Sequence, residues 1–428
     1  MLIVAAAGFI QTLPIPRWRD GYTRPLYYLL ALLLLSLQLA ELGINARVQV
    51  QGLDGQFAYR STAAYEEAYD ETAPLATRLQ KQDEGFYRVE KTYRYSRNDA
   101  LLYGYNGITH YSSTYHAAVN RLFGAMGFVY RRSWDTFYSS TPVTDALFGV
   151  KYVLSKTDIP AYSAVAGNRT VTAYENPYVL PVALAADAGL VDWTLPETDD
   201  PFAAQESLLS ALCGRETAVW KRPAVEEYND AHLTIFTLTM PHSGPLYAAL
   251  PAGSQTGASR LYVNGAYWGD CLSANSPNLL ALGRFSMGDT VSVVLEKHES
   301  AQLAGSWFAV LDETALERET DLLQQGGLQL AQVQGATLTG RITVAEDQVV
   351  YLSLPYSDGF TVRADGKPVE TFAISDSLLG ARLPAGTVDL TVTYTAPGFT
   401  AGGILSLLTA GGLAILAIWS IKRRRSAS

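Results

Sequence analysis

The stretch FTAGGILSLLTAGGLAILAIWSI, residues 399–421, contains no charged residue and is followed directly by Lys422, Arg423, Arg424 and Arg425. A helix needs ~20 mostly apolar residues to cross the ~30 Å hydrocarbon layer of a bilayer, and this stretch is long enough. Because Lys and Arg are retained on the cytoplasmic side of a membrane, the basic end predicts a spanning helix whose C-terminal end is inside. We therefore predict a membrane-anchored protein.

A second apolar stretch, LYYLLALLLLSL at residues 26–37, follows a group of three arginines that begins at Arg17. The same rule places these arginines in the cytoplasm. We predict spanning helices at residues 22–42 and 399–421, with the bulk of the chain between them extracytoplasmic in a bacterial cell membrane. The alternative for each stretch is the core helix of a soluble protein, and the length and flanking residues favour the membrane.

A third apolar stretch, Leu2 to Leu13, is too short to span and has no basic residues before it, so it is a poor signal peptide. We expect residues 1–16 to be the end of an earlier transmembrane helix. On this interpretation the chain is a piece of a multi-pass protein, and an upstream multi-span membrane protein is a candidate partner.

The net charge of −9 combines basic ends with a strongly acidic middle. An acidic surface argues against a nucleic-acid partner, which requires a basic face. No Cys-x-x-Cys or His-x-x-x-His spacing occurs, so no metal site and no cofactor are predicted. Cys213 and Cys271 would lie outside the cell, where they form either a disulfide or two buried thiols.

Strand and helix patterns alternate between residues 86 and 190. Apolar residues at helical spacing predict a helix over Ser113–Met126, with Ser112, Ser113 or Thr114 as its N-cap. Thr141 followed by Pro142 predicts the start of a second short helix. This alternation indicates a compact extracytoplasmic α/β domain.

An internal repeat follows, since residues 246–265 parallel residues 349–366. In each copy an apolar strand is followed by a strand that ends in Asn264-Gly265 or Asp365-Gly366, which are strong signals for type I′ hairpin turns. The pattern predicts two tandem β-sandwiches, joined by a linker helix at residues 314–325.

The predicted fold class is therefore a membrane-anchored α+β protein with two or three transmembrane helices, an extracytoplasmic α/β domain and two tandem β-sandwich domains. The predicted divisions are a partial transmembrane helix (1–16), a transmembrane helix (22–42), a connecting segment (43–85), the α/β domain (86–190), the first β-sandwich (200–300), the second β-sandwich (325–398), a transmembrane helix (399–421) and a cytoplasmic basic tail (422–428).

Several short stretches, in this order, resemble the C-terminal part of the YfhO-like family of bacterial membrane proteins, over roughly residues 26–422. They are Asn98-Asp99; Asn106-Gly107-Ile108 with Tyr111-Ser112-Ser113; Asn120, Gly124 and Gly127; residues 145–154; Tyr174-Glu175-Asn176 with Leu180-Pro181; residues 355–362; Asp365-Gly366; and Pro397-Gly398-Phe399. That family is similar to the GT-C glycosyltransferases, which use a polyprenyl-phosphate sugar on the outer face of the membrane. The resemblance implies sugar transfer to a cell-envelope polymer such as teichoic acid.

In GT-C enzymes the catalytic acid lies in the first extracytoplasmic loop, far upstream of the part that this chain resembles. The resemblance therefore supplies no catalytic residue here, and whether the chain is an enzyme stays open. The alternative is a non-catalytic, membrane-tethered carbohydrate-binding or structural envelope protein. The expected partners are the lipid bilayer, a polyprenyl-phosphate sugar and an envelope polymer.

Tyrosines crowd the stretch from residue 93 to residue 115, with amide, acid and imidazole side chains among them. Aromatic rings that stack on sugars and polar groups that bond hydroxyls are the usual chemistry of a sugar site, whereas plain packing of the domain is the alternative. The candidate substrate-binding residues are Asn98, Asp99, Tyr105, Asn106, His110 and Tyr111.

Two other groups of residues are candidate binding sites. The acidic group Glu197, Asp199 and Asp200 could bind a divalent cation, but the flanking prolines favour a solvated loop. Four aromatic residues of the first sandwich could form a platform for sugar binding, and packing of the core and hairpins is the alternative. They are Trp220, Tyr262, Tyr267 and Trp268.

Overall fold

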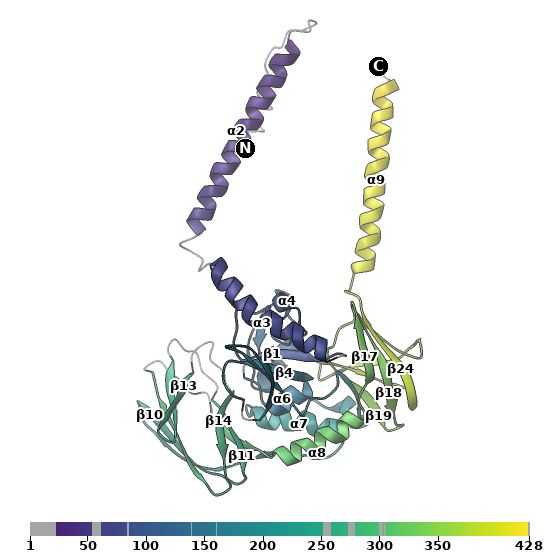
Figure 1. Cartoon of the computed structure of the whole chain (residues 1–428). Coiled ribbons are helices and arrows are strands. Elements are labelled where there is room, and N and C mark those ends of the chain that lie inside the picture. The colour runs from purple at the N-terminus through teal and green to yellow at the C-terminus, as the bar shows by residue number, and fades with distance from the viewer. Residues whose placement is uncertain are drawn as a thin grey trace. The chain divides into compact units, whose positions relative to one another are not determined.

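The computed structural model describes residues 23–426 except 54–60, 84, 138, 160, 251–257, 273–278, 299–302 and 304. The predicted partial helix at residues 1–16 lies outside the described residues. The chain divides into two compact units, Met1–Glu67 and Ala68–Ser428. Figure 1 shows the elements in chain order.

The described part of the first unit is dominated by helix α2 (Thr23–Leu53). The helix continues past the predicted end at residue 42, because Gly43 costs only about 1 kcal/mol in a helix and does not terminate one by itself. Its segment Ala31–Leu53 is long and apolar enough to cross a membrane. Helix α3 (Thr62–Gln82) follows, within the predicted connecting segment, residues 43–85.

The first sheet of the second unit has the strand order β1-β4-β6-β5. These strands are β1 (Arg88–Lys91), β4 (Val150–Ser155), β5 (Ser163–Gly167) and β6 (Thr172–Glu175). Strands β1 and β4 are parallel, while the other neighbours are antiparallel. Buried residues of α3, among them Leu75 and Leu79, pack with Val89 and Leu154 of this sheet.

Short helices connect these strands: α4 (Asp99–Tyr103), α5 (Ala117–Ala125) and α6 (Pro142–Leu147). The predicted cap of α6 is confirmed, because Thr141 Oγ1 accepts a hydrogen bond from the Thr144 amide at 3.3 Å. The predicted caps of α5 are wrong. Helix α5 begins at Ala117, after His116. Ser112 does not cap it, because its Oγ accepts a hydrogen bond from the Thr114 amide in the loop before the helix.

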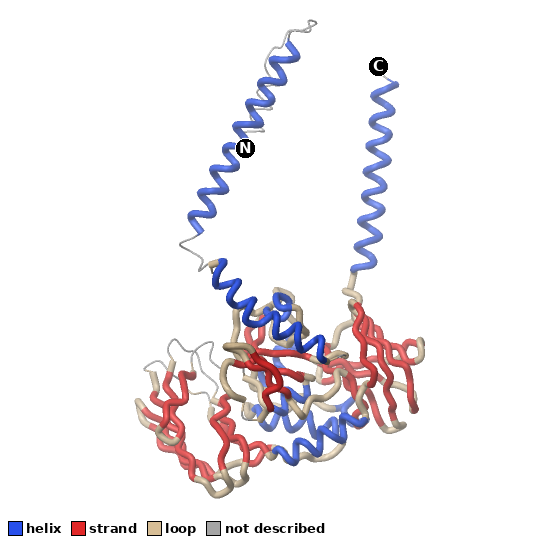
Figure 2. The backbone as a smooth tube through the Cα atoms, viewed as in Figure 1, coloured by secondary structure: helices blue, strands red, loops and turns tan. Residues whose placement is uncertain are grey.

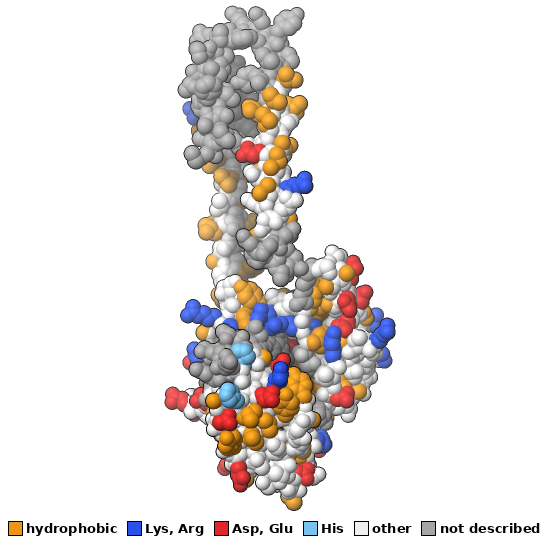
Figure 3. All heavy atoms as spheres, turned by 90° about the vertical axis from the view of Figure 1, so that its left-hand side faces the viewer, with side chains coloured by type: hydrophobic (Ala, Val, Ile, Leu, Met, Phe, Trp, Pro, Cys, Tyr) orange, Lys and Arg blue, Asp and Glu red, His pale blue; other side chains and the backbone are white. Residues whose placement is uncertain are grey.

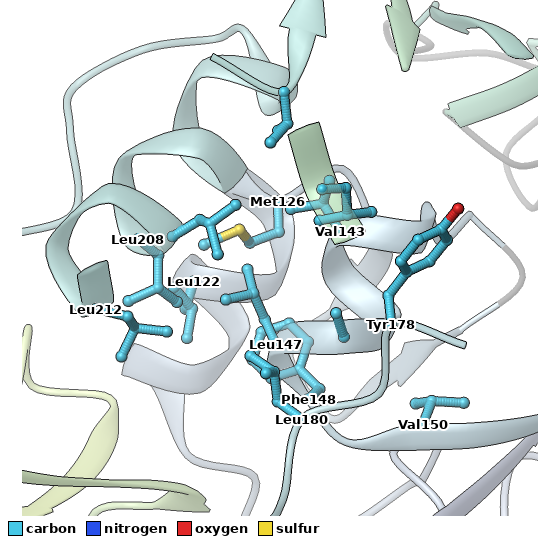
Figure 4. Close-up of a cluster of buried hydrophobic side chains, with 14 of the residues drawn as sticks. Leu122, Met126, Val143, Leu147, Phe148, Val150, Tyr178, Leu180, Leu208 and Leu212 are labelled. Atoms are coloured by element: carbon cyan, nitrogen blue, oxygen red, sulfur yellow. The ribbon is translucent and has the colours of Figure 1, made fainter. Parts of the chain in front are cut away.

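The largest hydrophobic cluster joins α5 and α6 to α7 (Pro201–Cys213). Figure 4 shows Leu122 and Met126 beside Leu208, with Leu147 in the same group. The cluster continues into later parts of the chain through Tyr351, whose hydroxyl donates to the Leu147 carbonyl oxygen at 3.0 Å. The region around residues 86–190 therefore shares its core with the C-terminal half.

Two pairs of sheets follow, which Figure 2 shows as strand-rich regions in red. The first pair has the orders β13-β12-β15-β10-β9 and β14-β11-β16-β8. Its strands are β8 (Trp220–Lys221), β9 (Ala224–Asn229), β10 (Leu233–Thr239), β11 (Gly244–Ala249), β12 (Ser259–Val263), β13 (Ala266–Cys271), β14 (Leu279–Phe285), β15 (Thr290–Glu296) and β16 (Trp307–Leu311). Both sheets contribute to one buried hydrophobic cluster, as expected for a β-sandwich.

The second pair has the orders β17-β18-β24-β20-β21 and β22-β23-β19-β7. Its strands are β7 (Ala183–Asp187), β17 (Gln329–Gln334), β18 (Thr337–Val344), β19 (Gln348–Pro355), β20 (Phe360–Ala364), β21 (Lys367–Pro368), β22 (Thr371–Ile374), β23 (Leu378–Ala381) and β24 (Gly386–Tyr394). Strand β7 pairs with β19 although about 160 residues separate them in the chain. Helix α8 (Glu313–Gln325) lies between the two sandwiches in sequence, as predicted.

The predicted internal repeat is confirmed by the sheet orders. In the two five-stranded sheets, β13-β12-β15-β10-β9 corresponds strand for strand to β21-β20-β24-β18-β17. Both hairpin turns also match, since φ is positive at Asn264 (51°), Gly265 (79°), Asp365 (49°) and Gly366 (77°), as a type I′ turn requires. The exact domain boundaries stay predictions.

The chain continues from β24 into helix α9 (Phe399–Ser426). Its segment Phe399–Trp419 is the second helix in the described part of the chain that is long and apolar enough to cross a membrane. This segment agrees with the predicted span, residues 399–421.

Candidate functional site

A cavity of about 470 Å³ lies between the loop that precedes α5 and the second sandwich. One side is formed by Gly107, Ile108, His110, Ser112 and residues 114–116. The other side is formed by β19, β20, β23 and β24. Its volume falls within the range of roughly 300–1,000 Å³ that is usual for small-ligand sites. We refer to it as the first cavity.

Two stretches that carry the family resemblance meet at the first cavity. Residues 106–113 supply part of one wall, and residues 355–362 supply Pro355, Tyr356 and Phe360 to the other. About 240 residues separate these stretches in the sequence, and the fold brings them to one place. The ring of Phe360 lies against that of Tyr394, with centroids 4.9 Å apart, so aromatic side chains form much of this wall.

Arg88 of β1 reaches this cavity from the sheet and is buried. Its Nη1 donates to the Phe148 carbonyl oxygen (2.6 Å) and to Ser353 Oγ (2.9 Å), and its Nη2 donates to the Ser353 carbonyl oxygen (2.7 Å). Burial lowers the pKa of Arg88 to about 10, so the guanidinium still carries its charge at neutral pH. Within the described part of the chain, no carboxylate forms an ion pair with it.

The opposite wall of the cavity carries two histidines and two hydroxyl groups. The His110 ring stacks on Tyr115 with centroids 4.5 Å apart, and burial lowers its pKa. His110 is therefore neutral at physiological pH and can both donate and accept a hydrogen bond. His116, Ser112 and Thr114 add polar atoms on the same wall.

Two buried acids lie behind this loop. Glu90 accepts hydrogen bonds from the Ile108 and Thr109 amides, the latter at 2.7 Å, yet burial raises its pKa. Burial also raises the pKa of Asp135 well above its usual value, with the charge of Glu90 adding to the effect. Neither carboxylate oxygen of Asp135 has a hydrogen-bond partner among the described residues. Glu90 thus holds the loop that forms the cavity wall.

Of the six predicted substrate-binding residues, His110 lines the first cavity. Asp99 is buried, where it pairs with Lys91 at 2.7 Å and accepts from the Ser96 amide at 2.7 Å. Tyr105 is also buried, and its ring stacks on Tyr103.

The three remaining predicted residues surround the same loop. Asn98 Oδ1 accepts a hydrogen bond from the Tyr111 amide at 2.8 Å. The Tyr111 side chain is exposed. Asn106 Nδ2 donates to the Tyr87 carbonyl oxygen at 3.2 Å. These contacts position the loop, and the role of all six residues in substrate binding stays a prediction.

The remaining candidates are the acidic group that includes Asp200 and the two cysteines. Asp200 caps α7 through the Phe202 amide (3.0 Å) and pairs with Arg222 at 2.6 Å, which is a structural role. No group of three or more potential metal-binding side chains occurs in the described part of the chain. Cys213 and Cys271 are free thiols and do not form a disulfide.

The predicted aromatic platform does not form as one surface. Trp220 is buried against Phe202 and Tyr247, which is core packing. Tyr262 and Tyr267 pack edge to face on the sheet surface, with centroids 5.7 Å apart. On the face of the molecule that Figure 3 displays, hydrophobic side chains gather on the folded body next to acidic and basic ones.

Arg88, Tyr356, Phe360 and Tyr394 are among the lining residues that the sequence analysis did not select as substrate-binding. No local signal distinguishes them, because each occupies an ordinary position in or beside a strand. Their shared location depends on how the second sandwich packs against β1 and α6.

The structure describes a mixed α+β protein with a helix that could span a membrane before its folded body and another after it. The chain belongs to the YfhO family: the family described as "Bacterial membrane protein YfhO" matches residues 1–406. It is 22% identical to "Uncharacterized protein YfhO" of Bacillus subtilis (strain 168), over 84% of this chain and 46% of that protein. The chain therefore spans about half the length of this curated relative.

Two solved structures show weaker likeness. One is the conserved protein of unknown function PA5104 from Pseudomonas aeruginosa PAO1, with 17% identity over 42% of this chain and 89% of that chain, at a TM-score of 0.13. The other is dimeric latent PorU from Porphyromonas gingivalis, with 10% identity over 56% of this chain and 27% of that chain, at a TM-score of 0.12. These scores are too low to carry an argument about fold or function.

Proposed function

We propose that this chain is the C-terminal part of a polytopic bacterial membrane glycosyltransferase. It would hold either the acceptor polymer or the head of a polyprenyl-phosphate sugar on the outer face of the membrane. In this proposal α2 and α9 span the bilayer, their basic flanks are cytoplasmic, and the folded body is extracytoplasmic. The observation that carries the proposal is the chemistry of the first cavity.

The first cavity combines one buried cation with aromatic and hydroxyl groups. The Arg88 guanidinium is bonded by neutral oxygens, so its charge is available to an anionic group of a ligand. Phe360 and Tyr356 offer aromatic faces on which a sugar ring can stack. A ligand that carries both a phosphate and a sugar, as polyprenyl-phosphate sugars and teichoic acids do, suits this combination.

In this proposal the chain contributes by positioning rather than by chemistry. No Asp or Glu is among the described residues that line the first cavity, so we assign no catalytic acid or base to it. Holding an acceptor in the right orientation beside a membrane-embedded reaction centre can lower the activation barrier of the transfer by several kcal/mol. The same absence of a carboxylate favours the second candidate, a tethered carbohydrate-binding protein without catalysis.

The topology is tested by labelling a Ser426→Cys variant in intact cells with a membrane-impermeant thiol reagent, after Cys213 and Cys271 are changed to serine. We expect Cys introduced at residue 426 to react only after the cells are opened. Leu101→Cys in the same background is the matched control, because Leu101 is 83% exposed on the folded body and should react in intact cells. Labelling at 426 in intact cells would contradict the topology.

The function is tested by deleting the gene in its bacterium and measuring the sugar content of the wall polymers. We expect the deletion to remove one sugar substituent. Complementation with the wild type should restore it, whereas a Tyr356→Ala, Phe360→Ala double variant that reaches the membrane in equal amount should restore it poorly. Unchanged wall polymers in the deletion strain would reject the transferase and favour the tethered binding protein.

A further inference from the structure

A second cavity, of about 550 Å³, lies between α6 and the first sandwich. One wall comes from the N-terminal turn of α6 and from β4 with the residues after it, and the other comes from β13 and β14. No residue of this cavity lines the first one. The volume accommodates one or two sugar rings, since small-ligand sites usually measure roughly 300–1,000 Å³.

Asp145 is a buried acid that lines the second cavity. It lies in the first turn of α6 and is 2% exposed. Its Oδ2 accepts a hydrogen bond from the Tyr162 hydroxyl at 2.5 Å, and its Oδ1 has no hydrogen-bond partner among the described residues. A buried oxygen without a partner costs about 1–3 kcal/mol, and a ligand hydroxyl in the cavity would satisfy it.

The protonation of Asp145 suits a neutral partner. Burial raises the pKa of Asp145 to about 8, although the Tyr162 and Ser140 hydroxyls oppose this rise. At neutral pH the group is therefore mostly an uncharged acid. Because Tyr162 donates to Oδ2, the acid proton belongs on Oδ1, from which it can be donated to a ligand oxygen.

Trp268 of β13 supplies an aromatic side chain to the same cavity. It is 37% exposed, and its Nε1 donates to the Ala281 carbonyl oxygen of β14 at 3.0 Å. This hydrogen bond ties the indole to the neighbouring sheet, so little rotamer freedom is lost when a ligand stacks on it. Hydroxyl groups complete the lining, from Thr92, Ser140, Thr141, Ser155 and Thr157.

The charges around the second cavity exclude an anionic ligand. The described residues that line it include no Lys, Arg or His, and they include the acids Asp145 and Asp158. Asp158 is exposed and accepts a hydrogen bond from the Tyr174 hydroxyl at 2.8 Å. A phosphate or a uronic acid would find no cation here, whereas an uncharged polyol finds hydroxyls, an acid and an indole.

We propose that the second cavity binds a neutral saccharide unit, with Asp145 bonded to a sugar hydroxyl and Trp268 stacked on the sugar ring. The inference goes beyond the proposed function, because binding here needs no transfer reaction and no phosphate. If the transferase proposal also holds, the second cavity would bind an uncharged part of the acceptor polymer, away from Arg88.

Binding is tested on the full chain in lauryldimethylamine oxide micelles, because maltoside detergents carry sugars that would compete. Saturation-transfer NMR measures the binding of methyl glycosides of glucose, galactose, mannose and N-acetylglucosamine, with glucose 1-phosphate as the anionic comparison. The variants are Trp268→Ala, Asp145→Ala and Asp145→Asn. Tyr228→Ala is the matched control, because Tyr228 is 58% exposed on β9, at the opposite edge of the same sheet.

We expect at least one neutral glycoside to bind, and both Trp268→Ala and Asp145→Ala to weaken it about tenfold. Asp145→Asn should stay within threefold of the wild type, because its amide donates where the acid proton did, and Tyr228→Ala should not change binding. If Asp145→Ala does not fold, Trp268→Ala decides the question.

Three outcomes would overturn the inference: no neutral glycoside binds, glucose 1-phosphate binds at least as tightly, or Trp268→Ala binds like the wild type. The wall-polymer measurement on the deletion strain is independent of this assay. A failure of the transferase proposal is therefore distinguishable from a failure of saccharide binding.

Discussion

Replacing Asp145 by asparagine should stabilise the protein at neutral pH, and the gain should shrink as the pH falls. Burial raises the pKa of Asp145 to about 8 in the folded state, whereas an unfolded chain restores it to about 4. Between these two values the folded state binds one more proton than the unfolded state. The contribution of Asp145 to the free energy of unfolding is complete below about pH 4 and is lost as the pH rises toward 8.

The slope follows from the linkage between protons and folding. Each pH unit in this window changes the free energy of unfolding by about 1.4 kcal/mol for one proton. Asparagine does not titrate and can still accept the hydrogen bond of Tyr162 through its Oδ1. The stability of the Asp145→Asn variant relative to the wild type should therefore rise by about 2.7 kcal/mol between pH 5 and pH 7.

The assay is urea unfolding of the full chain in micelles, followed by tryptophan fluorescence at pH 5, 6 and 7. Groups that titrate in both proteins cancel in the difference between their free energies of unfolding. The change of this difference with pH therefore comes from Asp145. The control is Leu101→Ala, because Leu101 is exposed and neither leucine nor alanine titrates, so its difference from the wild type should not vary with pH. A flat difference for Asp145→Asn, or one that falls with pH, would refute the reasoning.

Three further predictions test the fold. Leu122→Ala should cost about 2–5 kcal/mol in the free energy of unfolding, because Leu122 is fully buried in the largest cluster, whereas Leu101→Ala, at an exposed position, should change it by less than about 0.5 kcal/mol. Thr141→Ala should cost about 1 kcal/mol through the lost cap of α6, and Thr141→Ser should recover most of it. Arg88→Met should cost roughly 2–4 kcal/mol, because it removes the hydrogen bonds to Phe148 and Ser353; an unchanged urea midpoint would show that these bonds do not stabilise the fold.

Local features were predictable from the sequence because their causes are local. A hairpin turn at Asn264-Gly265 needs positive φ at two adjacent residues, and few residue pairs supply it. The cap of α6 depends on Thr141, Pro142 and Thr144, which lie within one turn of helix. The caps predicted for α5 failed because serine can also bond to its own loop, as Ser112 does with the Thr114 amide.

The candidate site was predictable only in part. The loop that contains Asn106 and His110 was selected from its aromatic and polar residues, and this loop does form one wall of the first cavity. Asp99 and Tyr105 have the same composition signal but are buried, because a residue's exposure depends on what the fold packs against it. Composition alone does not separate a tyrosine that binds from a tyrosine that packs.

The sequence by itself determined the apolar helices, the hairpin turns, the repeat of strands and the family. The helices and turns depend on runs and spacings within about 20 residues. The repeat and the family depend on the order of such short stretches along the chain. Only the tertiary structure decided that β7 pairs with β19, that Arg88 meets Phe360 at one cavity, and that burial raises the pKa of Asp145. Strand partners and burial arise from contacts between residues far apart in the chain, and a single sequence contains no local record of them.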